Sequence, residues 1–151
     1  MITAATLIER LGLTPHPEGG WFLETYRSED ILATAGLPDR YTAERCASTA
    51  IYYLLEADNF SALHRVASDE LFHFYLGSPV EIFVISPEGV AKTAIIGNDI
   101  RNGHIPQYLV PKGSIQGLRV KPGGSFALLG ATVAPGFEFA DFELILRADR
   151  N

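Results

Sequence analysis

The sequence contains little cysteine, little positive charge and no long apolar run. Cys46 is the single cysteine in 151 residues, which excludes an internal disulfide and a cysteine-based zinc cage. Lys and Arg number 12 against 18 Asp and Glu, for a net charge of −6, so we expect no nucleic-acid partner. No stretch approaches the roughly 18 apolar residues of a membrane helix, and the first residues lack the pattern of a secretory signal. We therefore expect a soluble cytoplasmic protein without a membrane partner.

The composition favours one β-rich globular domain over residues 1–151. Hydrophobic residues make up 47% and charged residues 20% of the chain, which is enough apolar material to form a core and excludes intrinsic disorder. Aromatic residues reach 11%, and 14 Gly and 9 Pro interrupt the chain. Aromatic-rich short segments separated by Gly and Pro are typical of β-sandwiches and barrels.

The hydrophobic pattern predicts one helix followed by about ten short strands. In the first dozen residues, Leu7, Ile8 and Leu11 share a helical face, with Thr3 as the cap and Gly12 as the stop. Residues 28–44 are polar and irregular, so we predict a surface loop or flap. A first strand is predicted at Trp21–Tyr26. From Ala47 onward, alternation with a period of two predicts strands at Ala47–Leu55, Ser61–Val66, Glu70–Leu76, Val80–Ser86, Ala91–Ile96, Gln107–Val110, Ser114–Val120, Phe126–Val133 and Asp141–Arg147.

His64 and Glu70 are the first candidates for chemistry. They lie on consecutive predicted strands, and if these strands pair as a hairpin their side chains can project from one face. Glu70 and His73 are three residues apart on one strand, so they point to opposite faces unless a bulge intervenes. By the same alternation, Glu70 shares its face with Phe72 and Phe74.

Two segments resemble the motifs of the cupin superfamily. Glu70, followed after six residues by Gly77, is similar to the second half of the first cupin motif. Residues 110–116, Val-Pro-Lys-Gly-Ser-Ile-Gln, resemble the second motif, in which Pro-x-Gly is followed by two residues and a histidine ligand. The resemblance implies an all-β fold, the double-stranded β-helix or jelly-roll barrel, here with a short N-terminal helix.

Further segments resemble one particular cupin family of small bacterial and fungal proteins, described as a domain of unknown function. They are His-Pro-Glu-Gly-Gly-Trp at 16–21, Tyr-Arg at 26–27, and residues 68–75, 129–137 and 141–144. This resemblance spans nearly the whole chain. It implies a barrel related to the dTDP-sugar epimerases, usually a homodimer, and no established reaction.

The chain departs from the metal-binding cupins at two ligand positions. Those proteins carry a His-x-His pair before the glutamate, whereas His64 stands alone, and Gln116 replaces the histidine of the second motif. An amide oxygen is a poor ligand for Fe, Zn or Ni. We expect either no cofactor or a weakly bound divalent metal ion, with His64, Glu70 and His73 as ligands if a metal binds.

We predict a pocket in which His64 is a general base and Glu70 is its catalytic partner. The predicted ligand-binding residues are Glu18, Trp21, Tyr26, Arg27, Phe74, Gln116 and Phe137. Asp141 and Glu143 share a face of the final strand, so one of them either orients the His64 imidazole as a carboxylate–imidazole dyad or belongs to a solvated strand edge. His104, in a polar turn, is expected to be solvated.

Three functions are compatible with these residues. The first is a metal-independent epimerase- or isomerase-type enzyme, whose carbohydrate or nucleotide-sugar-like ligand follows from the epimerase resemblance alone. The second is a metal-dependent oxygenase or isomerase, and the third is a non-catalytic small-molecule binding or sensor protein. In each case we expect a homodimer, formed when the Trp21–Tyr26 strand adds to a partner's sheet.

Overall fold

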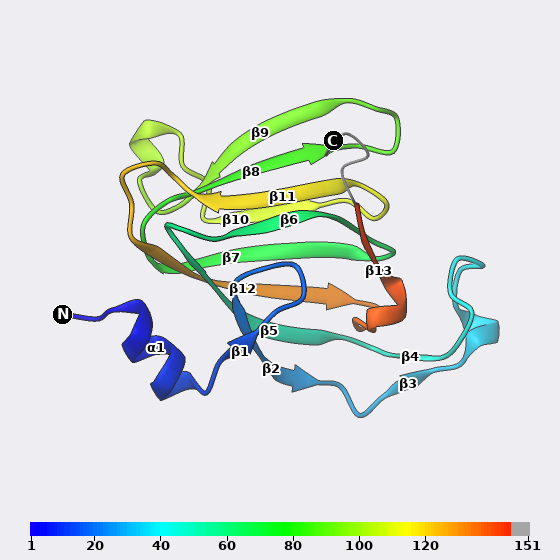
Figure 1. The fold of residues 1–151 in the computed structure, drawn as a ribbon. Coiled ribbons are helices and arrows are strands. Elements are labelled where there is room, and N and C mark those ends of the chain that lie inside the picture. The colour runs from blue at the N-terminus through cyan, green and yellow to red at the C-terminus, as the bar shows by residue number, and fades with distance from the viewer. Residues whose placement is uncertain (146–151) are drawn as a thin grey trace, which may run out of the picture.

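The computed structural model describes residues 1–145 and consists mainly of two facing antiparallel sheets (Figure 1). The six-stranded sheet has the order β1 (Thr14–Pro15), β2 (Trp21–Arg27), β5 (Thr49–Glu56), β12 (Phe126–Ala134), β7 (Asp69–Gly77) and β10 (Gln107–Val110). The five-stranded sheet has the order β13 (Phe142–Leu144), β6 (Phe60–Val66), β11 (Ile115–Val120), β8 (Val80–Ile85) and β9 (Ala91–Ile96). This arrangement confirms the predicted all-β architecture.

The main core lies between the two sheets, because alternate residues of each strand face inward. Its buried members all lie on strands of the two sheets. They are Tyr53, Leu55, Phe72, Val80, Ile82, Val84, Ile96, Val110, Leu118, Val120, Ala127, Leu129 and Ala131. Packing of this core holds the sheets at the fixed separation on which a cavity between them depends.

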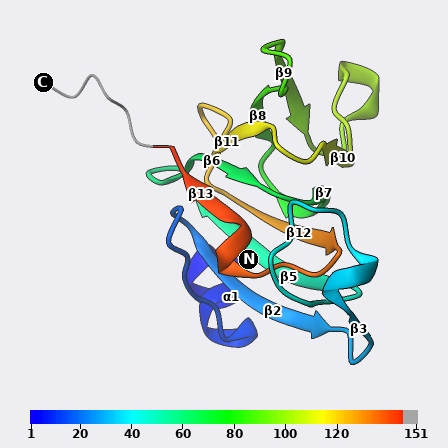
Figure 2. The ribbon, with the colours of Figure 1, turned by 90° about the vertical axis from the view of Figure 1, so that its right-hand side faces the viewer.

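Helix α1 (Ala4–Leu11) covers the outer face of the six-stranded sheet. The Thr3 hydroxyl accepts a hydrogen bond from the amide of Thr6, and Gly12 ends the helix with a φ of 69°, as the capping pattern predicts. Leu7 packs with Leu13, Leu54 and Leu128 in a second apolar cluster. Figure 2 shows α1 beside β2 and β5, far from β8 and β9. Within residues 1–145 no helix is long and apolar enough to cross a membrane.

The predicted strands match the observed ones within two residues, except at the C-terminal end. There a strand is present, but β13 (Phe142–Leu144) is shorter than the predicted strand Asp141–Arg147, because Asp141 belongs to a 3-10 turn (Phe139–Asp141) and Ile145 follows the end of the strand. Residues 146 and 147 lie outside the described part of the chain. The predicted surface loop at 28–44 also contains β3 (Ile31–Leu32), which pairs with β4 (Arg45–Cys46).

Candidate functional site

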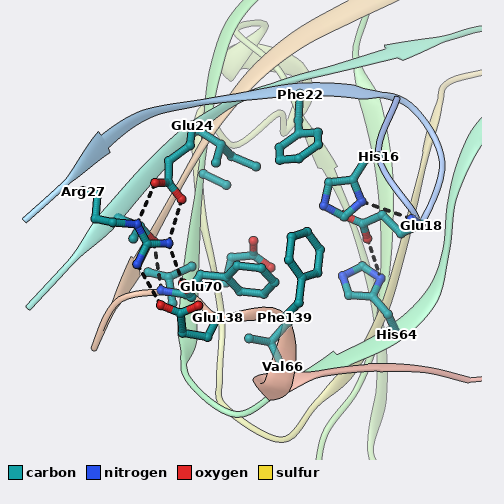
Figure 3. Close-up of a pocket in the computed structure, with 15 residues that line it drawn as sticks. His16, Glu18, Phe22, Glu24, Arg27, His64, Val66, Glu70, Glu138 and Phe139 are labelled. Carbon is teal, nitrogen blue, oxygen red and sulfur yellow. Dashed lines mark hydrogen bonds and ion pairs between the residues drawn. The ribbon is translucent and has the colours of Figure 1, made fainter. Parts of the chain in front are cut away.

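A cavity of about 70 Å³ lies between the sheets (Figure 3). Its wall comes from β2, β5, β6, β7 and β12, from the loop before β2 and from the turn before β13. The lining residues are His16, Glu18, Phe22, Glu24, Arg27, Thr49, Ile51, His64, Val66, Glu70, Ala131, Val133, Phe137, Glu138 and Phe139. A cavity needs roughly 10–15 Å³ to hold one water molecule, so this one has room for a few waters or a small polar molecule.

His64, Glu70 and Gln116 converge, although by a different route from the predicted hairpin. β6 pairs with β11 and β13 and not with β7, so His64 and Glu70 lie in opposite sheets. His64 is directly opposite Gln116 in the β6–β11 ladder, so their side chains share one face. The Gln116 Nε2 then donates across the core to Glu70 Oε1 at 2.8 Å. The two facing sheets therefore bring together residues that no single ladder connects.

Glu18 is the carboxylate that orients His64. The His64 Nδ1 lies 2.7 Å from Glu18 Oε2, and the Ser61 hydroxyl donates to the same oxygen. The loop that carries Glu18 is fixed on β6, because the amide of Ala62 donates to the Glu18 carbonyl at 2.7 Å. The following Gly19 has a φ of 108°, and a Cβ there would lie 2.1 Å from the Phe60 carbonyl oxygen. Only glycine permits this close approach.

The contacts of His64 fix the position of its proton. Nδ1 faces two acceptors, Glu18 Oε2 and the Ala62 carbonyl, each at 2.7 Å, so Nδ1 must carry a proton and donate. Figure 3 shows the other ring nitrogen directed toward the interior of the cavity. Burial lowers the pKa of His64, but the carboxylates of Glu18 and Glu70 and the Ala62 carbonyl outweigh burial and raise the pKa above its usual value.

His16 is a second imidazole in the cavity wall, which the sequence reasoning did not single out. Its Nδ1 accepts a hydrogen bond from the amide of Glu18 at 3.1 Å, so this nitrogen carries no proton. Burial lowers the pKa of His16, the nearby Glu18 opposes that effect, and His64 adds to it. His16 is therefore neutral near pH 7. The one available signal was its place at the start of the His-Pro-Glu-Gly-Gly segment.

Glu70 has an unusual acidity for a glutamate. Removal from water inside the barrel and the neighbouring Glu18 carboxylate raise its pKa, while His64 and the Gln116 amide lower it, with a net value of about 7. Both its protonated and its ionised forms are therefore populated near neutral pH. A carboxyl of this kind can both donate and accept a proton under physiological conditions.

A β-bulge in β2 decides which of its side chains reach the cavity. The register shifts between Glu24 and Tyr26, so Tyr26 turns outward, where it is 53% exposed, and Arg27 turns inward. Trp21 pairs with Leu54 and packs beneath α1 in the outer cluster. The structure thus places Arg27 in the cavity wall, and it corrects the predicted positions of Tyr26 and Trp21.

Arg27 closes one side of the cavity by linking β2 to the turn before β13. It makes two hydrogen bonds to Glu24, at 2.8 and 3.0 Å. It also donates to Glu138 Oε1 at 2.8 Å and to the Phe137 carbonyl at 3.1 Å. Phe137 lines the cavity as predicted, and Phe139 beside it was missed. Phe74, by contrast, packs against the main core and is absent from the cavity wall.

Two further predicted roles do not match the structure. His73 points away from Glu70, because their alternation is unbroken, and its Nε2 bonds the Thr132 hydroxyl at 3.0 Å on the other face of β7. Asp141 forms a buried ion pair with Arg45 at 2.6 Å and does not orient His64. Glu143 pairs with Arg65 at the surface, so the strand-edge alternative holds for that residue.

The side chains in the cavity that could bind a metal do not form a complete metal site. Among residues 1–145, no group of three or more His, Cys, Asp or Glu side chains is arranged to hold a metal ion. His73 is on the wrong face, and Glu70 is bonded to the amide of Gln116. The Nδ1 atoms of His16 and His64 are both engaged. Glu18 is held by His64, and Glu24 and Glu138 are held by Arg27. Among the described cavity residues, this leaves the Nε2 of His64 and the Glu70 carboxylate as possible metal ligands, without a third that converges on them.

Comparisons with known proteins agree with this architecture. The chain is 42% identical to protein SO0799 from Shewanella oneidensis, with a TM-score of 0.83 over 96% of this chain and 85% of that one. A hypothetical protein from Leishmania major is 34% identical, with a TM-score of 0.85 over 95% and 88%. The uncharacterized protein YML079W of Saccharomyces cerevisiae is 29% identical over 95% of this chain and 75% of its own length.

More distant structures share the fold alone. Oxalate decarboxylase of Bacillus subtilis is 13% identical, with a TM-score of 0.59, and the match spans 88% of this chain but 30% of that one. The model of the family described as Cupin superfamily (DUF985) matches residues 5–145. This match covers nearly the whole chain and includes every element that builds the cavity, and the chain therefore belongs to this cupin family.

Proposed function

We propose that this protein is a small-molecule enzyme that transfers a proton within its barrel without a metal, in an epimerase- or isomerase-type reaction. The observation that carries the proposal is the Glu18–His64 pair, in which Nδ1 is held at 2.7 Å by a carboxylate while Nε2 faces the cavity. A carboxylate fixed on Nδ1 selects the tautomer whose Nε2 can take a proton and stabilises the imidazolium that forms. His64 is the proposed general base.

Glu70 is the proposed acid on the other side of the cavity. It stands on the opposite sheet from His64, and its pKa of about 7 allows it to return a proton near neutral pH. Two such groups facing one small space can remove a proton from one face of a carbon and deliver one to the other. Gln116 holds Glu70 in place through its 2.8 Å hydrogen bond. A carbohydrate substrate rests on the epimerase analogy alone.

The proposal can be tested by hydrogen exchange in D₂O. The protein is incubated with a panel of aldoses, ketoses, nucleotide sugars and small amines, and mass spectrometry records the gain of one deuterium. We expect exchange into at least one compound, reduced at least about 100-fold by His64→Asn and less strongly by Glu18→Gln. Glu143→Gln, which removes a surface carboxylate, is the matched control. The two titrating groups predict a bell-shaped rate profile centred near neutral pH.

The outcomes separate this function from its two alternatives. Exchange that persists in His64→Asn contradicts the proposed base. Exchange that appears only with added divalent metal and disappears with a chelator favours a metal-dependent enzyme. Tight binding of a panel compound without exchange favours a binding or sensor protein.

A further inference from the structure

The cavity wall has more negative than positive permanent charge. Four carboxylates line it, on Glu18, Glu24, Glu70 and Glu138, against the single guanidinium of Arg27. His64 and His16 are the other titratable groups of the wall. Even with His64 protonated and paired to Glu18, the remaining carboxylates outnumber Arg27. The field inside the cavity is therefore negative. The low dielectric of the barrel interior strengthens it around Glu18 and Glu70, whereas Glu24, Arg27 and Glu138 are partly exposed and are screened by water.

Arg27 has no free hydrogen-bond donor for an anionic ligand. Its five N–H groups have five acceptors. Nε donates to Glu24, Nη1 to Glu138 and Cys46 Sγ, and Nη2 to Glu24 and the Phe137 carbonyl. A bidentate arginine–carboxylate pair is a strong interaction. A carboxylate or phosphate entering the cavity would have to displace one of these partners and face the others.

The imidazoles do not supply a free positive charge either. His16 is neutral, since its Nδ1 accepts from the amide of Glu18, and its proton lies on Nε2, which is an uncharged donor. The charge of His64, when present, is neutralised by Glu18 at 2.7 Å. The buried Oε1 of Gln116, which is bonded to Glu70 through its nitrogen, has no hydrogen-bond partner among the described residues. Acceptors thus exceed available donors in this part of the barrel.

Aromatic rings complete the wall. Phe22, Phe137 and Phe139 line the cavity, and Figure 3 shows the rings of Phe22 and Phe139 beside the two imidazoles. The faces of such rings attract cations, and the attraction is larger where water is excluded. Carboxylates attract a positive charge, and aromatic faces pack against an apolar organic group. Together they suit a ligand that carries both features.

We propose that the cavity selects a small organic cation, a compound with an ammonium or amidinium group on a short apolar body, and disfavours carboxylates of the same size. This inference rests on the proposed function in one respect, that the cavity is the ligand site. It makes the charge of the ligand, rather than a sugar ring, the feature that the protein recognises.

The test compares two probes of equal size and opposite charge. Propylammonium and propionate are titrated into the whole protein at pH 8.5 and equal ionic strength, and binding is followed by saturation-transfer NMR. At this pH Glu70, with its pKa of about 7, is ionised, while an alkylamine, which titrates at about 10, remains charged. We expect propylammonium to bind in roughly the millimolar range and propionate to give no saturable signal.

A variant and its control locate the binding. Glu70→Gln keeps the shape of the side chain and removes one charge, so the affinity for propylammonium should fall by about tenfold. Glu143→Gln removes an exposed carboxylate outside the cavity and should change nothing. Lowering the pH to 6 should weaken binding in the parent, because Glu70, with its pKa of about 7, gains a proton there, and less so in Glu70→Gln. Propionate binding as tightly as propylammonium, or equal effects of the two variants, would overturn the inference.

The binding of a cation can be measured independently of any catalytic activity. Cation binding without deuterium exchange would contradict the proposed enzyme and leave the ligand class intact. Exchange that depends on His64, found together with preferential binding of propionate, would contradict the ligand class and leave the proton-transfer function intact.

Discussion

At the scale of single residues, the direction of one proton decides what His64 can do. Two acceptors at 2.7 Å hold the proton on Nδ1, so the lone pair of the neutral ring lies on Nε2, toward the cavity. Without Glu18, the Ala62 carbonyl alone would orient the ring, and the imidazolium would lose its counter-charge. In the proposed reaction Glu18 is therefore a positioning residue, while His64 and Glu70 face the cavity.

The first prediction concerns the missing metal ligand. Gln116→His would place an imidazole next to His64 in the ladder and near Glu70. Together they would form the two-histidine, one-carboxylate set that suits non-haem iron and related ions, with Glu18 supporting His64 from the far nitrogen. We expect Co²⁺ to bind at least about tenfold more tightly than to the parent in a calorimetric titration.

The control is the same variant with either His64 or Glu70 changed to Ala, in which the gain should vanish. Equal weak affinity in Gln116→His and in the parent would show that the three side chains do not converge as described. The cupin fold would be unaffected by that result, but the roles given to His64 and Glu70 would have to be withdrawn.

At the scale of elements, strand alternation explains which predictions succeeded. In β7 the alternation is regular from Glu70 to His73, so the sequence correctly indicates that these side chains face opposite ways. In β2 a bulge between Glu24 and Tyr26 reverses it, and a bulge leaves no reliable mark in a single sequence. The inward position of Arg27 therefore could not be derived from spacing.

The turn before β13 is fixed by a buried charge pair, and this gives the second prediction. The side chains of Arg45 and Asp141 are each 4% exposed, and their closest atoms lie 2.6 Å apart. Asp141→Ala leaves the Arg45 guanidinium buried without a counter-charge, which costs about 3–5 kcal/mol of unfolding free energy. Chemical denaturation should show this loss. A change within about 0.5 kcal/mol, as expected for Glu143→Ala at the surface, would contradict the described burial.

At the scale of the whole molecule, the site is assembled from segments far apart in the chain. His16 and Glu18 precede β2, His64 and Glu70 lie on facing sheets, and residues 137–139 close the cavity. Local patterns predicted the strands, and the resemblance to cupins predicted that His64, Glu70 and Gln116 would converge. The partner of His64 was missed, because the position of Glu18 depends on a long-range contact between its loop and β6.

The assembly of the molecule is the subject of the last prediction. β1 pairs with just Trp21 and Phe22 of β2, so within residues 1–145 the segment 23–27 forms an outer edge of the six-stranded sheet. Leu23 and Tyr26 are 37% and 53% exposed on this segment. An open edge with apolar side chains favours strand addition by a second copy. Light scattering at micromolar concentration should therefore give twice the monomer mass.

Two variants distinguish this edge from the competing surface, the outer face of the five-stranded sheet, where Phe60, Phe83 and Leu144 are exposed. Lysine at an edge blocks pairing through its charge, so the double substitution Leu23→Lys and Tyr26→Lys should give the monomer mass, while Phe83→Lys should leave the dimer intact. A parent protein with the monomer mass contradicts the dimer itself. If Phe83→Lys alone dissociates the dimer, the edge of β2 is not the interface and the outer face of the five-stranded sheet is. A lysine there would bury a charge between two apolar faces, which would explain the dissociation.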